Sequence, residues 1–349
     1  MDDRGIVVID LPTRVRAPSP LHAERLGSGR IAADANIDRP LAGIGFCVMG
    51  LMVFSLQDVI IKLMSAQYSI WQLAFVRAVV VLAIMCPILL MTSGLNGFRT
   101  QQLGRQLLRG ALAVISYTSY YLAVSRMPLI DAGALYASAP LFVTLFSSLL
   151  LGESVGVRRW SAVAVGFVGV LVMLRPGFGV FQPIALCAVA SAALYAYSTT
   201  VTRRLGATES ALTITVYSNF VYLAVSTLMM GGLALLPLED GWRESHLFLA
   251  GSWQTPELKP LMLMLVCGVL AGIGFFSLAK AYSVAPVSSV APIEYTYLVW
   301  ALALGFLVFG DLPGLMTCAG SAIVIGSGIY IIRREATLSR AHLKGPRPR

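Results

Sequence analysis

The sequence predicts an all-α integral membrane protein whose ten transmembrane helices form two inverted five-helix repeats. Composition is the first indication: the 349 residues are 57% hydrophobic and only 12% charged, whereas a soluble domain carries about 25% charged residues. The second is the length of the apolar runs. They approach the roughly 20 residues that a helix needs to cross a bilayer and exceed the roughly 10 of a membrane barrel strand. The third is an internal duplication.

The duplication relates residues 127–153, MPLIDAGALYASAPLFVTLFSSLLLGE, to residues 285–311, APVSSVAPIEYTYLVWALALGFLVFGD. A shift of 158 positions aligns the two segments without a gap and matches Glu153 with Asp311. The second segment carries one acid, Glu294, well inside an apolar run. A duplicated membrane segment with a buried acid in one copy is typical of a transporter whose site lies between two halves.

A weaker match elsewhere supports the same division of the chain. At an offset of 142 positions Lys62 aligns with Arg204, and Arg77 then falls on Asn219. An odd number of spans in each repeat inserts the two copies in opposite orientations. The sequence therefore predicts a pseudo-two-fold axis in the membrane plane and alternating access around a central cavity.

The elements follow in order along the chain. Residues 1–39 are polar and mixed in charge, and we expect a disordered cytoplasmic tail. We expect one repeat over 41–175, a second over 183–332, and a basic cytoplasmic tail over 333–349. The long link 234–259 is predicted to be an external cap or an interfacial loop. The expected spans are 41–63, 71–91, 107–125, 129–151, 157–175, 183–202, 211–233, 260–282, 287–309 and 314–332.

The basic residues orient the chain in the membrane. If both termini are cytoplasmic, most lysines and arginines fall in the tails and inner loops, as the positive-inside rule requires. We therefore expect a multi-pass protein of the bacterial inner membrane with both ends in the cytoplasm. The net charge of +9 serves this orientation, and no nucleic-acid partner is expected. The five cysteines are scattered through apolar runs, so neither a metal site nor a cofactor is expected.

Glu294 is the residue on which the functional prediction depends most. A carboxylate in hydrocarbon costs about 2.5–3.5 kcal/mol on insertion scales, so it needs a partner, a proton or water. We interpret Glu294 as a group that contacts substrate or titrates, with a buried salt bridge to Lys280 as the alternative. Pro292 in the same span and Pro140 in the fourth span each free a backbone carbonyl, which is tolerated beside water or another helix.

Asp58 and Arg77 lie at similar depths near the outer ends of the first two spans. The two side chains are close enough in depth to pair with each other. Alternatively, Asp58 pairs with Lys62 one turn further on and Arg77 extends toward the interface. Direct contact of Asp58 with substrate is the third interpretation. Asp131 begins the fourth span and needs no role in transport.

Tyrosines that stand clear of the span ends are candidates for lining a cavity. They are Tyr117, Tyr136, Tyr195 and Tyr295. Tyrosines nearer the ends more often form the interfacial belt. An aromatic cavity that also holds a carboxylate suits a planar, amphipathic or cationic organic solute. Ordinary packing between helices is the alternative.

The paired segments quoted above resemble the signature of EamA-type members of the drug/metabolite transporter superfamily, in which a glycine and an acid close the fourth span of each repeat. The resemblance covers about residues 41–332. The runs SLQDVIIKL and PIEYTYLVWA are similar to a bacterial branch that includes S-adenosylmethionine and riboflavin uptake carriers. This resemblance favours Asp58, Glu294 and Tyr295 as site residues. Asp311 stands where the family usually has glutamate, a difference that we interpret as structural.

We therefore expect a secondary transporter that moves a small organic metabolite by alternating access, with riboflavin or S-adenosylmethionine uptake as the specific candidates. An exporter of amino acids, other metabolites or drugs is the alternative in the same class. A membrane-embedded enzyme acting on lipids or isoprenoids is the alternative from another class, and its acids and histidine would come from residues 239–246. The expected substrate-binding residues are Glu294, Tyr295, Asp58, Arg77, Tyr117, Tyr136 and Tyr195.

Overall fold

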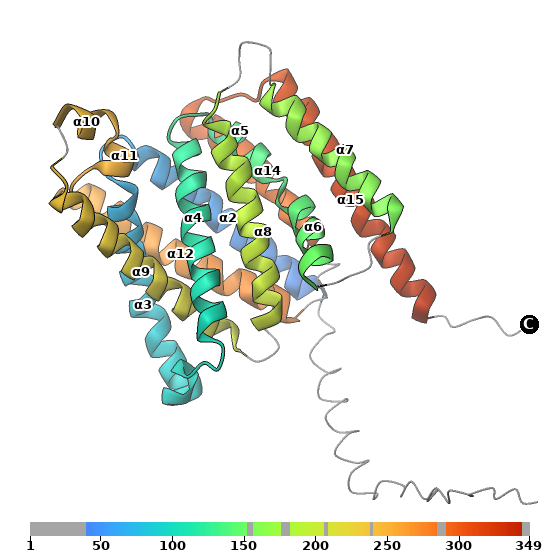
Figure 1. Cartoon of the computed structure of the whole chain (residues 1–349), viewed down its shortest axis with the longest axis horizontal. Helices are drawn as coiled ribbons and strands as arrows, with labels where there is room; N and C mark the ends of the chain where they lie inside the picture. The colour runs from blue at the N-terminus through green and yellow to red at the C-terminus, as the bar shows by residue number, and fades with distance from the viewer. Residues whose placement is uncertain are drawn as a thin grey trace, which may run out of the picture.

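The computed structural model describes residues 40–151, 156–175, 182–205, 209–237, 240–284 and 291–343. The predicted tail 1–39 and the aligned acid Glu153 lie outside this part, as do Pro286 and the last residues of the basic tail. Within the described ranges the chain is helical throughout and contains no strand (Figure 1). This confirms the prediction of an all-α protein.

The described helices succeed one another with short links. Their bounds are α2 Pro40–Met64, α3 Ile70–Ser93, η1 Gly94–Phe98, α4 Leu103–Val124, α5 Leu129–Tyr136, α6 Ala139–Leu151, α7 Val157–Leu174, α8 Ala185–Leu205, α9 Ala211–Leu235, α10 Asp240–Ser245, α11 Leu247–Ala250, α12 Leu258–Val284, η2 Ala291–Tyr295, α14 Thr296–Leu304, η3 Gly305–Phe309 and α15 Leu315–Leu343.

Seven helical segments of the described chain are long and apolar enough to cross a membrane. Three shorter apolar helices, Trp160–Leu174, Ile293–Phe309 and Leu315–Tyr330, coincide with the fifth, ninth and tenth predicted spans. The membrane architecture agrees with the prediction, while the count of ten spans stays a prediction.

Helix packing follows a two-fold pattern. Helix α2 packs against α12, and its counterpart α8 packs against α4, the counterpart of α12. Likewise α3 packs on α12 as α9 packs on α4, and α14 packs on α2 as α6 packs on α8. In the pairs α3–α9 and α7–α15 each helix packs on its own counterpart. Helices α7 and α15 run side by side along one edge of the bundle (Figure 1). Exchanging the two halves therefore leaves these helix contacts unchanged.

Two close approaches repeat this relation at the level of single residues. A Cβ atom built on Gly268 of α12 would lie 2.6 Å from Val80 of α3, and one on Gly110 of α4 would lie 2.6 Å from Val221 of α9. Val80 and Val221 are 141 positions apart, which gives the offset between α3 and α9. Gly110 and Gly268 are 158 positions apart, which gives the offset between α4 and α12. The two glycines allow the helices to cross at close range at both of these equivalent contacts.

The helix starts agree with this register. Ser69 caps α3 and Ser210 caps α9, each accepting a backbone N–H of the first turn, as a serine N-cap does. The two caps are again 141 positions apart. The sequence offset of 142 was therefore wrong for this pair by one residue, and the counterpart of Arg77 is Ser218 and not Asn219.

The fourth and ninth predicted spans are not the continuous helices that were expected. The fourth is broken between α5 and α6, where Pro140 cannot donate to the carbonyl of Tyr136. The described part of the ninth begins as the 3₁₀ turn η2, continues as α14 and ends in the π-helical turn η3. The 158-residue shift places the break of one span on the irregular start of the other. Both irregular segments lie beside the central cavity described below.

The described part of the long link covers the start of α3 and contains the short helices α10 and α11, while its predicted external position stays a prediction. Trp71 Nε1 donates to the carbonyl of Leu249 at 2.8 Å. Gln72 exchanges two hydrogen bonds with the backbone of Gln254, at 2.6 and 3.0 Å. These bonds fix the link against the first turn of α3 (Figure 1).

Candidate functional site

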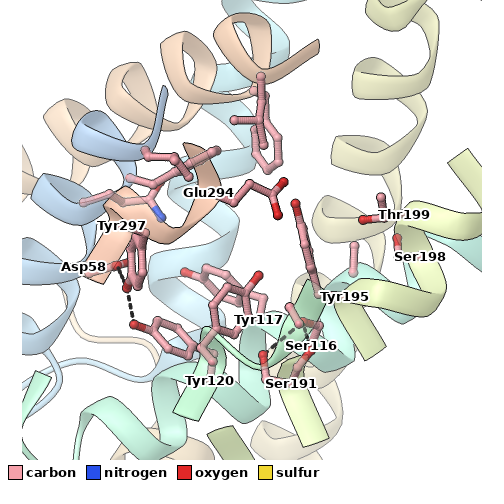
Figure 2. Close-up of a pocket in the computed structure, with 18 of the residues that line it drawn as sticks. Asp58, Ser116, Tyr117, Tyr120, Ser191, Tyr195, Ser198, Thr199, Glu294 and Tyr297 are labelled. Atoms are coloured by element: carbon pink, nitrogen blue, oxygen red, sulfur yellow. Dashed lines mark hydrogen bonds between the residues drawn. The ribbon is translucent and has the colours of Figure 1, made fainter. Parts of the chain in front are cut away.

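A cavity of about 210 Å³ lies between the two halves of the molecule. A site for a single water needs only about 10–15 Å³ by the same kind of measure, so this cavity has room for an organic solute. Its wall is mostly apolar and aromatic and includes several buried ionisable groups (Figure 2). Residues of the wall used below are Gln57, Asp58, Arg77, Arg109, Ser116, Tyr117, Tyr120, Tyr121, Tyr136, Ser191, Tyr195, Tyr222, Glu294, Tyr295 and Tyr297.

Asp58 of α2 is 4% exposed and accepts hydrogen bonds on both carboxylate oxygens. Tyr121 of α4 donates to Oδ1 at 2.5 Å, and Tyr297 of α14 donates to Oδ2 at 2.6 Å. Tyr121 in turn accepts from Gln57 Nε2 at 2.8 Å. A carboxylate buried in a membrane-spanning helix is thus satisfied by hydroxyl donors, which are strong partners for an ionised acceptor. The expected pairing of Asp58 with Arg77 is therefore wrong.

The Asp58 network joins the two halves of the chain. Because the hydroxyl hydrogen of Tyr297 is used toward Asp58, the short hydrogen bond between Tyr297 and Tyr120 is donated by Tyr120 (Figure 2). Asp58 and Tyr120 belong to the first half, whereas Tyr297 belongs to the second. Any separation of α14 from α2 and α4 must break these bonds.

Arg77 of α3 is 2% exposed and packs its guanidinium on aromatic rings. Its Cζ lies 4.2 Å from the ring centre of Tyr117 and 4.3 Å from that of Tyr222. Such contacts favour a cation, especially where water is excluded. The buried Nε and Nη2 atoms have no hydrogen-bond partner in the described part of the chain.

Glu294 lies in the 3₁₀ turn η2 and is partly buried at the cavity wall. In Figure 2 its carboxylate and the hydroxyl of Tyr195 point toward each other. The ring of Tyr195 also contacts that of Tyr136, with centroids 5.6 Å apart. The proposed salt-bridge partner, Lys280, has an exposed side chain at the end of α12.

Tyr295 lies next to Glu294 and depends on a glycine of α15. A Cβ atom built on Gly328 would lie 1.8 Å from the Tyr295 hydroxyl oxygen. No side chain can occupy that position while Tyr295 keeps its present place. Gly328 therefore positions Tyr295 at the cavity wall.

Arg109 lies near the start of α4, toward one end of the cavity. It donates to Thr202 Oγ1 of α8 at 2.6 Å, to the carbonyl of Ile214 at 3.4 Å, and to Ser218 Oγ of α9. A further bond, from Ser116 Oγ to the carbonyl of Ser191 at 2.9 Å, also links α4 to α8 (Figure 2). These bonds join the first half to the second beside the cavity.

At the opposite end, the cavity wall stops at the Asp58 network. One turn further along α2, Lys62 forms a salt bridge of 3.1 Å with Asp311, which follows η3. The Lys62 ammonium also lies 4.4 Å from the ring centre of Phe309. The alternative pairing of Lys62 with Asp58 is therefore wrong, and Asp311 has the structural contact that was inferred for it. This end is the one predicted to be external.

Asp131 is separate from the cavity. Thr317 of α15 donates to its Oδ1 at 2.6 Å. Asp131 lines a second, smaller space of about 160 Å³ together with Arg175. This position agrees with the interpretation that Asp131 has no part in the main site.

The structure brings all of the predicted site residues to the cavity wall, but whether they bind substrate stays a prediction. Sequence reasoning missed Tyr297 and Arg109, and it set Tyr120 and Tyr121 aside because they lie near the end of a span. A signal for the last two was present. They are three and four residues from Tyr117, so all three share one helix face.

The sequence profile of the EamA-like transporter family matches this chain twice, over residues 41–175 and 182–334. A riboflavin transporter of Vibrio cholerae serotype O1 is 30% identical over 305 residues, which are 86% of this chain and 96% of the relative. An S-adenosylmethionine uptake transporter of Rickettsia felis is 27% identical over 303 residues, with coverage of 86% and 96%. The pseudopaline exporter CntI of Pseudomonas aeruginosa is 26% identical over 300 residues, with coverage of 86% and 99%.

A solved structure described only as "Crystal structure of protein" has a TM-score of 0.56 at 17% sequence identity and covers 83% of this chain and 98% of its own. That likeness supports the fold alone. The double match of the profile, the two-fold packing and the full-length relatives agree with one another. The chain belongs to the EamA-like transporter family, within the drug/metabolite transporter superfamily.

Proposed function

We propose that this protein is a secondary transporter that carries a small organic metabolite across the bacterial inner membrane by alternating access, with uptake of riboflavin or S-adenosylmethionine as its specific activity. The observation that carries the proposal is the cavity between the halves, in which Asp58 is held by tyrosines from both. Relatives named for uptake of these two solutes support the specific candidates.

The arrangement suits a state that is closed to the outside. The Asp58 network and the bridge between Lys62 and Asp311 lie between the cavity and the end predicted to be external. The cavity wall extends the other way to Arg109, near the start of α4. Opening to the outside requires these contacts between halves to break, as alternating access demands.

Uptake of labelled riboflavin and labelled S-adenosylmethionine into cells that lack their own carriers tests the proposal. We expect one of the two solutes to enter above the empty-vector rate. Glu294→Gln should abolish most of this uptake, because it removes a charge from the cavity wall. Glu257→Gln is the matched control, since Glu257 is exposed and distant from the cavity wall.

Two results would contradict the proposal. If neither solute enters cells that contain the protein in their membrane, the proposed specific activity is wrong. Equal uptake by both glutamine variants and the unchanged protein would remove Glu294 from the mechanism. Immunodetection of each variant in the membrane fraction separates lost transport from lost protein.

Export is the second candidate, because the pseudopaline exporter CntI matches over nearly its whole length. Vesicles with the protein in a known orientation distinguish the two directions. Faster accumulation when the cytoplasmic face is outside would favour an exporter. The opposite preference favours uptake.

A further inference from the structure

Arg77 carries two hydrogen-bond donors that the protein does not use. Its Nε and Nη2 atoms are buried and have no hydrogen-bond partner among the described residues. The two N–H groups lie on the same edge of the guanidinium plane, the edge that binds carboxylate and similar groups through two parallel hydrogen bonds. Leaving such donors buried and unmade is costly, so an acceptor is expected from outside the chain.

A second, partly buried arginine shows that this fold can satisfy a guanidinium. Arg109 of α4 occupies the equivalent crossing, that of α4 with α9, and donates to Thr202, Ser218 and a backbone carbonyl. By the two-fold relation Ser218 is the counterpart of Arg77, and Arg109 is the counterpart of Cys267. The two crossings are alike in position, but only Arg77 lacks acceptors for this edge.

The Asp58 network does not satisfy this edge, and the buried Oε1 of Gln57, which has no partner among the described residues, forms no hydrogen bond with Arg77. Both oxygens of Asp58 already accept from Tyr121 and Tyr297. The hydroxyl of Tyr117, whose ring contacts Arg77, is itself buried without a hydrogen-bond partner. Arg77 and Tyr117 both line the cavity. This part of the wall is therefore rich in unused donors.

We propose that the Nε and Nη2 edge of Arg77, with the Tyr117 hydroxyl beside it, recognises a planar group with two adjacent hydrogen-bond acceptors on the transported solute. A carboxylate and the N/C=O edge of a heteroaromatic ring share this chemistry. The rings of Tyr117 and Tyr222 hold the guanidinium plane, so the direction of the two donors is fixed before the solute arrives. The inference rests on the proposed function, whose site it assigns.

Small planar probes test the recognition without knowledge of the natural solute. Benzoate carries an anionic acceptor pair, cytosine carries a neutral N/C=O pair, and benzamidinium has the shape of benzoate with donors in place of acceptors. Dissociation constants for the three are measured by thermal shift on the purified full-length protein in detergent. We expect benzoate or cytosine to bind at least tenfold more tightly than benzamidinium. Benzoate alone indicates a carboxylate, and cytosine alone indicates a ring edge.

Two variants of Arg77 and one control complete the design. Arg77→Gln removes the charge and the fork, and Arg77→Lys keeps the charge but loses the fork, so it remains informative if the first variant does not fold. Each is expected to weaken acceptor-pair binding by about 10-fold to 100-fold, the effect of hydrogen bonds to a charged group. Arg126→Gln, at an exposed arginine that does not line the cavity, should leave the probe affinities unchanged.

The outcomes separate this inference from the proposed function. Equal affinities in the unchanged protein and Arg77→Lys would overturn the inference, as would tighter binding of benzamidinium than of both acceptor probes. If riboflavin or S-adenosylmethionine is transported and Arg77→Lys does not raise its KM, the proposed function stands and the inference fails. If neither solute is transported but the acceptor probes bind through Arg77, the specific activity fails and the inference stands.

Discussion

The crossing of α3 with α12 and the crossing of α4 with α9 each hold one arginine, buried in the first and partly buried in the second, on helices that are not counterparts. In the first crossing the arginine is Arg77 of α3. In the second it is Arg109 of α4, although the counterpart of α3 is α9. Val80 meets Gly268 in the first as Val221 meets Gly110 in the second. Equivalent backbones thus carry unlike side chains.

Other equivalent positions differ in the same way. The shift of 158 positions matches Glu294 with Tyr136 and Tyr297 with Ala139, while the offset of 142 matches Asp58 with Thr200. In these pairs one half carries the ionisable or hydrogen-bonding group that the cavity uses, and the other carries a different type. In the proposed mechanism, the backbone symmetry provides two similar ways of opening, whereas the unlike side chains provide a single binding site. The following experiments test this distinction between the halves.

The largest effect is expected from Asp58→Asn. An asparagine offers one oxygen and one donor where two tyrosine hydroxyls now donate to a carboxylate. Two hydrogen bonds to a charged group, each worth about 1.5–3 kcal/mol, are lost or weakened, so transport should fall about 100-fold or more. The measurement is the initial rate of solute uptake into proteoliposomes.

Thr200→Val is the comparison in the other half. Thr200 is buried, and its hydroxyl donates only to the carbonyl of Ala196 in its own helix, at 2.9 Å. A nearly isosteric valine should reduce transport less than about threefold, since such a local bond is worth about 1 kcal/mol or less. A loss as large as that of Asp58→Asn would mean that the halves share the chemistry equally.

Arg109→Gln should destabilise the protein more than Arg77→Gln does. Arg109 makes hydrogen bonds to three acceptors on α8 and α9, and its loss is expected to cost about 3 kcal/mol. Arg77 leaves Nε and Nη2 unbonded, so its removal should cost less stability while it weakens solute binding. Thermal unfolding midpoints in detergent, measured without solute, check the order. A lower unfolding midpoint for Arg77→Gln than for Arg109→Gln would contradict a structural role for Arg109 and a binding role for Arg77.

Sequence reasoning reached much of this arrangement because the signals were local. Apolar length gave the helices, the gapless alignment gave the two halves, and a lone acid in an apolar run located Glu294. Hydrogen-bond partners could not be read in this way. Tyr297 and Tyr121 meet Asp58 only because α2, α4 and α14 converge, and periodicity within one helix does not report how helices converge. The one-residue error at Ser218 arose because the offset of 142 was taken from Lys62 and Arg204 in α2 and α8, whereas the N-caps of α3 and α9 are 141 positions apart.

Gly328→Ala tests a difference in volume between the halves. The second half pairs Tyr295 with Gly328, and the matching positions of the first half are Ala137 and Val170. An added methyl group would overlap the Tyr295 hydroxyl, which lies 1.8 Å from the ideal Cβ position, and overpacking of this kind costs about 1–3 kcal/mol. We expect a roughly tenfold rise in KM as Tyr295 moves.

The double variant Gly328→Ala with Tyr295→Ala separates steric overlap from a general loss of packing. If overlap is the cause, the alanine at 328 should have little further effect once the ring is gone. Val170→Ala serves as the control in the first half. It creates space without displacing Tyr295, so it should lower stability but leave KM close to that of the unchanged protein.

Lys62→Gln should have a small effect, and it acts on the balance between the inward-open and outward-open states. The bridge to Asp311 is partly exposed, with side-chain exposures of 17% and 23%, and exposed pairs contribute about 0.2–1 kcal/mol. Loss of the bridge therefore favours outward opening by at most about fivefold. In a background without native cysteines, a cysteine at the cavity residue Leu51 should react correspondingly faster with an impermeant reagent added outside. Asp311→Asn should act alike, whereas exchanging the two charges should restore slow labelling. Unchanged labelling in both single variants would mean that the bridge does not distinguish the two states, and that the closure depends on the Asp58 network alone.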